Sequence, residues 1–64
     1  MKNTKTSKLA AKRKGLNKKQ IDLAREVGIT RSYYANIERG IRNPSLRVAK
    51  KIAAVLNSTV DELF

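Results

Sequence analysis

Apolar residues along this chain of 64 residues recur at intervals of three and four, the spacing of helices that bury one face. No segment alternates apolar and polar residues as a half-buried strand does. The clearest stripe predicts a helix over residues 46–56, with Ser45 as its N-cap. The residues of that stripe are Leu46, Ala49, Ile52, Ala53 and Leu56.

Four further helices are predicted from the same spacing and from residues that start or stop helices. Their expected ranges are 8–16, 20–27, 31–39 and 60–64. Hydroxyl side chains accept backbone N–H groups at helix starts, and the expected caps are Ser7, Thr30 and Thr59. Residues that tolerate left-handed backbone angles end helices, and the expected stops are Asn17, Gly28 and Gly40. In the first helix, Leu9, Arg13 and Leu16 are expected to share one face.

The helices over 20–27 and 31–39 are joined by about three residues around Gly28, which is the helix-turn-helix arrangement. The pattern therefore predicts an all-α, compact bundle of five helices. We expect one domain over residues 7–64, because the length suits a single core. Residues 1–6 are polar and without periodicity, and they are expected to form a basic flexible tail.

The net charge of the chain indicates what kind of partner it binds. Fifteen Lys or Arg oppose five Asp or Glu, so the net charge is +10 and an anionic partner is expected, either nucleic acid or lipid headgroups. A hydrophobic content of 41% is too high for a wholly disordered chain. No run of about eighteen apolar residues could span a bilayer, and no apolar stretch follows the basic start as in a signal peptide. We therefore expect no membrane partner and a cytoplasmic, nucleoid-associated protein.

Composition also excludes several chemistries. With no Cys and no His, the chain cannot form disulfides, Cys/His metal sites or Ser-His-Asp triads. The few carboxylates form no recognisable acid–base pair, and no phosphate-binding loop is present. We expect no enzyme, no cofactor, no metal and no small-molecule ligand.

The motifs resemble a known family. Gln20-Ile21-Asp22-Leu23-Ala24, followed by Val27-Gly28-Ile29-Thr30, is similar to the Q-x-x-L-A-x-x-x-G-[VI]-[ST] signature of the lambdoid phage repressor and Cro proteins, the XRE-type family. Ile37-Glu38-Arg39-Gly40 and Arg42-Asn43-Pro44-Ser45 resemble its I-E-x-G-x-R-x-P-S continuation. The resemblance covers residues 9–64 and implies a lambda repressor-like DNA-binding domain.

The end of the first helix departs from the family pattern R-x-x-x-G-[LY]-[ST]-Q. Without a gap, Asn17 stands at the glycine position and Lys19 at the cap. Alternatively, Gly15-Leu16 is the family's G-L pair, followed by two inserted residues. We prefer the ungapped match, because Asn tolerates the same backbone angles as Gly.

A helical wheel divides the 31–39 segment into two sides. Tyr34, Ile37 and Glu38 are expected to face the core, while Ser32 and Asn36 face away and suit insertion into a major groove. The resemblance implies four base-reading residues: Arg31, Ser32, Tyr33 and Asn36. For Arg31 a phosphate contact is the alternative, and for Tyr33 packing against a neighbouring helix.

Further site residues are expected outside the base-reading set. Gln20 is implied to bind the DNA backbone and to brace the recognition helix. Further backbone contacts are expected from Lys18, Lys19, Arg39, Arg42 and Asn43. Arg13 and Glu38 are implied to form a partly buried ion pair. A dimer patch is expected at Val60, Leu63 and Phe64, with closure of the monomer core as the alternative.

The function expected is that of a dimeric, sequence-specific regulator, a bacterial or phage repressor bound to a palindromic operator in double-stranded DNA. An antitoxin that also binds its own operator is the first alternative. An RNA-binding coactivator-like module and a membrane-active cationic peptide rank lower. The basic tail is interpreted either as an arm along the DNA minor groove or as a solubilising segment.

Overall fold

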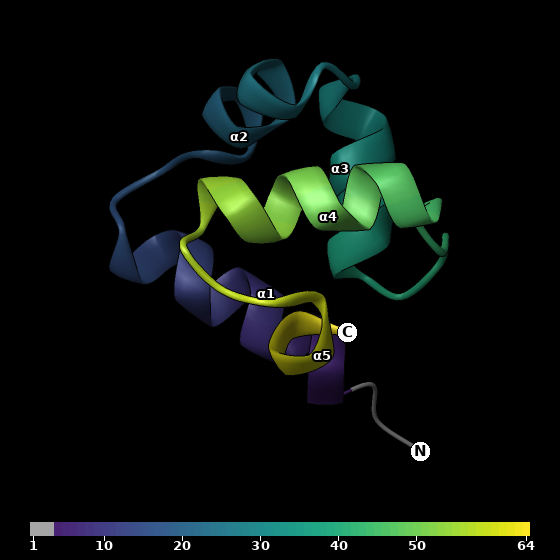
Figure 1. The fold of residues 1–64 in the computed structure, drawn as a ribbon. Helices are drawn as coiled ribbons and strands as arrows, with labels where there is room; N and C mark the ends of the chain where they lie inside the picture. The colour runs from purple at the N-terminus through teal and green to yellow at the C-terminus, as the bar shows by residue number, and fades with distance from the viewer. Residues whose placement is uncertain (1–3) are drawn as a thin grey trace.

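The structure, a computed structural model, describes residues 4–64, with side chains from Lys8 onward. Within this range it contains five helices and no strand, which confirms the all-α prediction (Figure 1). The helices are α1 (Thr4–Gly15), α2 (Gln20–Val27), α3 (Arg31–Glu38), α4 (Leu46–Val55) and α5 (Val60–Leu63).

The start of α1 differs from the prediction. The helix begins at Thr4 rather than at residue 8, so Ser7 lies inside it and is not its N-cap. No Gly or Pro interrupts residues 4–14, so nothing in the sequence prevents this extension. Residues 4–6 of the predicted tail therefore belong to α1, and its residues 1–3 lie outside the described part of the chain.

The predicted caps are present at three helices. Oγ1 of Thr30 accepts the backbone N–H of Tyr33 at 3.0 Å, and Ser45 and Thr59 make the equivalent bonds at α4 and α5. At α2 the N-cap is Lys19, which has no hydroxyl group. The Asp22 carboxylate accepts the Lys19 backbone N–H at 3.2 Å, and this bond supplies half of a capping box.

The turn between α1 and α2 follows the ungapped alignment. Asn17 has a φ of 59°, in the left-handed region that the family's glycine would occupy. Gly28 ends α2 with a φ of 88°, as predicted. α3, α4 and α5 each end one residue earlier than predicted, which places Arg39, Leu56 and Phe64 at the C-cap positions.

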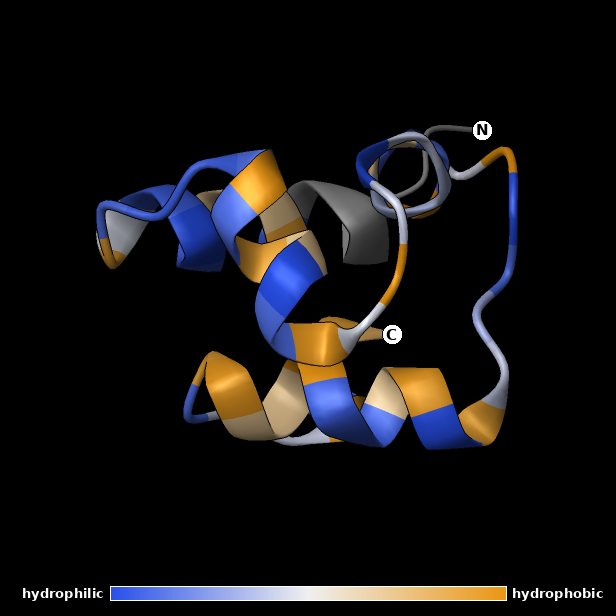
Figure 2. Cartoon of the chain, turned by 90° about the horizontal axis from the view of Figure 1, so that it is seen from above, coloured by the Kyte–Doolittle hydropathy of each residue, from blue (hydrophilic) through white to orange (hydrophobic). Residues whose placement is uncertain are grey.

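The core lies between the helices rather than along one pair. α2 packs on α3 and α4, α1 packs on α3 and α5, and α4 crosses in front of α3 in Figure 1. Along α4, at the bottom of Figure 2, orange apolar segments alternate with blue hydrophilic ones. The fully buried large side chains come from α1, α2, α3 and α4 and from the residue that follows α4, and they are Leu9, Leu23, Tyr34, Ile37, Ile52 and Leu56.

Two apolar residues of the predicted stripes are not buried. Leu46 is 64% exposed, because it opens α4 beside the mostly exposed loop of residues 39–45. Leu16, which was expected to share a buried face with Leu9, lies just past the end of α1 and is 44% exposed.

Candidate nucleic-acid interface

One carboxylate, that of Glu38, connects α1, α2 and α3. Glu38, on α3, pairs with Arg13 of α1, with 2.6 Å between Arg13 Nε and Glu38 Oε2. Arg13 Nη2 also donates to Glu38 Oε1 at 3.3 Å, and the Tyr34 hydroxyl donates to Oε2 at 2.5 Å. The two charged side chains are only 9% and 7% exposed. Arg13 and Glu38 thus form the buried ion pair that the resemblance implied.

The environment of Glu38 favours its charged form. Burial by itself would raise the pKa of Glu38, but hydrogen bonds from Arg13, Tyr34 and Gln20 outweigh it and lower that pKa below its ordinary value. The hydrogen bond to Glu38 raises the pKa of Arg13. Burial, followed by the bond to Glu38, raises the pKa of the Tyr34 hydroxyl. All three groups are therefore held in their ordinary states near neutral pH.

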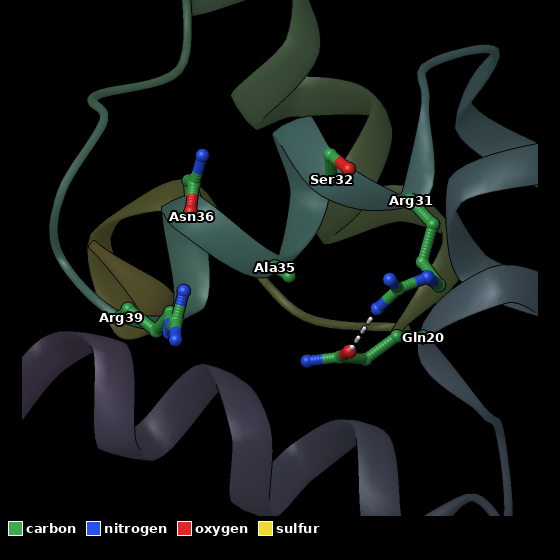
Figure 3. A pocket seen from close by; sticks show the side chains of 6 residues that line it. All are labelled: Gln20, Arg31, Ser32, Ala35, Asn36 and Arg39. Atoms are coloured by element: carbon green, nitrogen blue, oxygen red, sulfur yellow. Dashed lines mark hydrogen bonds between the residues drawn. The ribbon is translucent and has the colours of Figure 1, made fainter.

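Gln20 connects this buried cluster to the surface. Its Nε2 donates to Glu38 Oε1 at 3.0 Å, and its Oε1 accepts from Arg31 Nη1 at 3.4 Å. Because Nε2 has two hydrogens, one remains for another acceptor. The first residue of α2 is thereby oriented against the first residue of α3, and Figure 3 shows the contact as a dashed line.

An open hollow lies along the outward face of α3. Its lining residues come from α3, from the residue that follows α3 and from the start of α2, and they are Gln20, Arg31, Ser32, Ala35, Asn36 and Arg39 (Figure 3). Polar hydrogen-bonding groups and arginines surround the two small side chains, Ser32 and Ala35. This combination allows close approach of another backbone while offering donors and acceptors to it.

Three of the four predicted base-reading residues line this hollow, and one does not. Arg31, Ser32 and Asn36 are among its lining residues, but Tyr33 is not. Tyr33 is half-buried and packs against the hydrophobic core, as its alternative interpretation held. The guanidinium carbon of Arg42 lies 5.1 Å from the centre of its ring.

The residues predicted to contact the DNA backbone are more dispersed. Gln20 and Arg39 line the hollow, and Arg42 and Asn43 are exposed in the loop that follows α3. Lys19 is exposed at the N-cap of α2. The Lys18 ammonium group pairs with the Glu26 carboxylate at 2.8 Å in an exposed ion pair, and its contact with DNA stays a prediction.

The predicted dimer patch needs a correction. Leu63 is 2% exposed and belongs to the hydrophobic core, so it cannot form part of a surface between two subunits. Val60 and Phe64 are half-buried and pack against the same core. α5 therefore contributes to the monomer core, while Val60 and Phe64 keep exposed surface and stay a prediction for the dimer interface.

Sequence reasoning missed one contact beside this hollow. The Arg42–Tyr33 contact had no sequence signal, because the two residues are nine positions apart in different elements.

The interface is free of negative charge. All five side-chain carboxylates of the chain lie elsewhere, since none of them lines the hollow.

Within residues 4–64, no helix is long and apolar enough to cross a membrane. The same part of the chain contains no group of three or more acidic, His or Cys residues that could hold a metal ion.

Comparison with known proteins assigns the fold to a family. The chain matches the helix-turn-helix family over residues 9–63. It belongs to the XRE-type helix-turn-helix family. Members of this family are transcriptional regulators that bind double-stranded DNA. In this domain, α2 and α3 are the two helices of the helix-turn-helix motif.

Several named proteins are similar to this helix-turn-helix domain. It is 47% identical over 45 residues to an Archaeoglobus fulgidus protein named as an uncharacterized HTH-type transcriptional regulator, covering 70% of this chain and 64% of that protein. It is 45% identical over 58 residues to the HTH-type transcriptional regulator SlrR of Bacillus subtilis, covering 89% and 37%. It is 39% identical over 56 residues to the cryptic phage CTXphi transcriptional repressor RstR of Vibrio cholerae, covering 88% and 50%. The chain therefore spans less than two thirds of each of these relatives. No solved structure matches the chain significantly.

Proposed function

We propose that this domain is a sequence-specific repressor that binds a palindromic operator as a homodimer, with α3 in the major groove. The observation that supports this most directly is the composition of the hollow along α3. It joins hydrogen-bonding side chains, two arginines and two small residues, and it has no carboxylate. A base edge needs such donors and acceptors, and a phosphate backbone needs positive charge.

Three residues of α3 are proposed to read bases. Arg31 can donate two hydrogen bonds to a guanine, and the Asn36 amide can pair in the same way with an adenine. Each such pair discriminates against a wrong base by ~1–3 kcal/mol. Ser32 is proposed to accept or donate one further bond, and Ala35 beside it lets the helix approach the bases closely.

The backbone contacts are proposed to surround these readers. Gln20 offers its remaining Nε2 hydrogen to a phosphate while its contact with Arg31 orients that arginine. Arg39, Arg42, Asn43 and Lys19 are exposed and are proposed to contact phosphates on either side. Such contacts set the register of α3 on the duplex but contain no sequence information.

Dimerisation is proposed because one small helix-turn-helix unit contacts too few bases to be selective alone. The molecule measures 30 × 20 × 19 Å, so two copies side by side can place their α3 helices ~34 Å apart, one turn of DNA. A repressor role is proposed by analogy with RstR, which is named as a transcriptional repressor.

Selection from random duplex DNA at several salt concentrations tests this proposal. We expect a palindromic consensus whose half-sites are one turn apart, and an affinity that falls steeply with salt. Asn36→Ala should relax the consensus at one position per half-site. The matched surface variant Arg39→Gln should weaken binding to all sequences equally.

Two results would contradict the proposal. Absence of any consensus would exclude sequence-specific recognition, and a log–log salt slope near zero would exclude binding through phosphates. For the dimer, sedimentation at micromolar concentration should show association, or DNA titration should show cooperative occupation of the two half-sites. A strict monomer that fills half-sites independently would refute this part.

A further inference from the structure

The side chain of Arg42 is held against the recognition helix by an aromatic ring. Its guanidinium carbon lies 5.1 Å from the centre of the Tyr33 ring. A cation over an aromatic face within about 6 Å is attracted by the electron density of the ring. Tyr33 lies on α3, whereas Arg42 lies in the loop between α3 and α4, so the contact fixes a loop residue against the helix.

Both partners of this contact are themselves anchored. Tyr33 is half-buried and packs against the hydrophobic core, so its ring cannot swing freely. The backbone N–H groups of Ile41 and Arg42 donate to the carbonyl oxygen of Asn36, at 2.9 and 3.2 Å. The loop therefore starts from a fixed point on α3, and its arginine is restrained at the backbone and at the guanidinium.

Contact with the Tyr33 ring leaves the charge of Arg42 without an ionic partner. A guanidinium group has five N–H donors in one plane, in a fork that matches the oxygens of a phosphate. Among the side chains that the structure describes, residues 8–64, no carboxylate forms a salt bridge with Arg42. The planar fork is thus positioned without being neutralised, as a bidentate contact to a phosphate requires.

Tyr33 occupies a different place from the proposed base readers. The hollow along α3 is lined by Arg31, Ser32 and Asn36, which come from the same helix, but not by Tyr33. Its position between the core and the Arg42 guanidinium suits support rather than readout.

We propose that Tyr33 is a positioning residue that holds Arg42 for contact with a DNA phosphate beside the recognition helix, and that Tyr33 does not read a base. This inference rests on the proposed DNA-binding function. In this proposal Tyr33 makes no direct base contact. It holds Arg42 in place for a contact with the DNA backbone, and this arrangement of the two residues is called the clamp below. An arginine that is already restrained loses less side-chain entropy when it binds.

The test compares four variants on two duplexes, the selected operator and a scrambled duplex of equal length. Arg42→Gln should weaken binding to both duplexes by the same factor and lower the salt slope by about 0.9 for each phosphate that residue 42 no longer neutralises. Tyr33→Leu removes the aromatic face and should weaken both about twofold to fivefold per half-site. Tyr33→Phe keeps the ring and should bind like the wild type. In the double variant, Tyr33→Leu should add nothing to Arg42→Gln, because the arginine that the ring positions is already absent.

Thermal melting of each variant without DNA shows whether it is folded before binding is measured. If Tyr33→Leu does not fold, Tyr33→Met replaces it, since its longer side chain fills more of the same space without an aromatic face. If Tyr33 had only a structural role, Tyr33→Leu would change the melting temperature, would leave the salt slope at the wild-type value and would show no coupling to Arg42→Gln.

Three results separate this inference from the function on which it rests. Loss of preference at one base pair in Tyr33→Leu, with unchanged binding to the scrambled duplex, would overturn the inference and show that Tyr33 reads a base. Full additivity of Tyr33→Leu and Arg42→Gln would also overturn it. If the wild type binds both duplexes equally, sequence-specific recognition fails, while coupling between Tyr33 and Arg42 on scrambled DNA would still support the clamp.

Discussion

Removal of the Glu38 carboxylate is the substitution that should damage this domain most. In Glu38→Ala the Arg13 guanidinium loses its ionic partner, although its side chain is only 9% exposed. The Tyr34 hydroxyl and the Gln20 amide lose an acceptor in the same step. A buried charge and two polar groups are then left without the partner that compensated their removal from water.

The expected loss is a large share of the total stability. Breaking a buried ion pair by removing one partner costs ~3–5 kcal/mol, more than the net gain from the intact pair. A domain of this size has a free energy of unfolding of roughly 3–10 kcal/mol, at ~0.05–0.15 kcal/mol per residue. Because ~1 kcal/mol shifts the melting temperature of a small domain by ~4–8 °C, Glu38→Ala should be largely unfolded near physiological temperature.

Urea and thermal unfolding followed by circular dichroism measure this loss. The matched control is Glu26→Ala, which makes the same chemical change on α2 but removes an exposed pair with Lys18. Glu26 is 44% exposed, so its substitution should change the free energy of unfolding by less than ~1 kcal/mol. Equal shifts for Glu38→Ala and Glu26→Ala would refute the reasoning, because burial of the pair would then make no difference.

Further predictions concern pH and the backbone. Below pH 4.5, the ordinary pKa of a glutamate, stability should fall as the pH approaches the lowered pKa of Glu38, because the unfolded chain takes up the proton first. In urea unfolding, the free energy of unfolding of Glu38→Gln should fall less steeply with decreasing pH. Above pH 10, stability should fall again, because the unfolded tyrosine ionises while the pKa of folded Tyr34 is raised, and Tyr34→Phe should not show its share of this loss. Gly15→Ala should stabilise α1 by ~0.5–1 kcal/mol in calorimetry, since the added Cβ meets no atom within 4 Å. Gly28→Ala should destabilise the domain by ~1 kcal/mol, because the φ of Gly28 is +88°. An increase in the free energy of unfolding for both variants would contradict the backbone argument. Thr30→Ala should lose ~1 kcal/mol in urea unfolding through the missing cap, and Thr30→Ser should lose little; equal losses would assign the effect to the methyl group instead.

Local signals predicted most of the helix boundaries. The caps at Thr30, Ser45 and Thr59 and the left-handed Asn17 involve residues at most four positions apart, so the sequence contains all of their partners. The start of α1 was missed because a hydroxyl residue inside a helix looks the same in sequence as one that caps it. Ser7 shows this ambiguity.

Burial was predicted less well, because it depends on where neighbouring helices end. A helical wheel gives the direction of a side chain but not whether another element covers it. Leu46 follows the stripe of α4 and is exposed, while Leu63 was expected at a surface and is buried. The Arg13–Glu38 pair came from the family resemblance, whereas the placement of Gln20 between Glu38 and Arg31 required distances between two helices, α2 and α3.

The distribution of charge links stability to binding in this small domain. Of the five carboxylates, Glu38 and Glu26 are paired with basic side chains and Asp22 caps α2, while the remaining two lie at the start of α5. None of them faces the hollow along α3, so the positive charges there repel one another in the free protein. A DNA backbone neutralises these charges, and a ligand that binds only the folded state also stabilises it. The net charge of +10 therefore opposes folding of the free domain and favours the proposed complex with DNA.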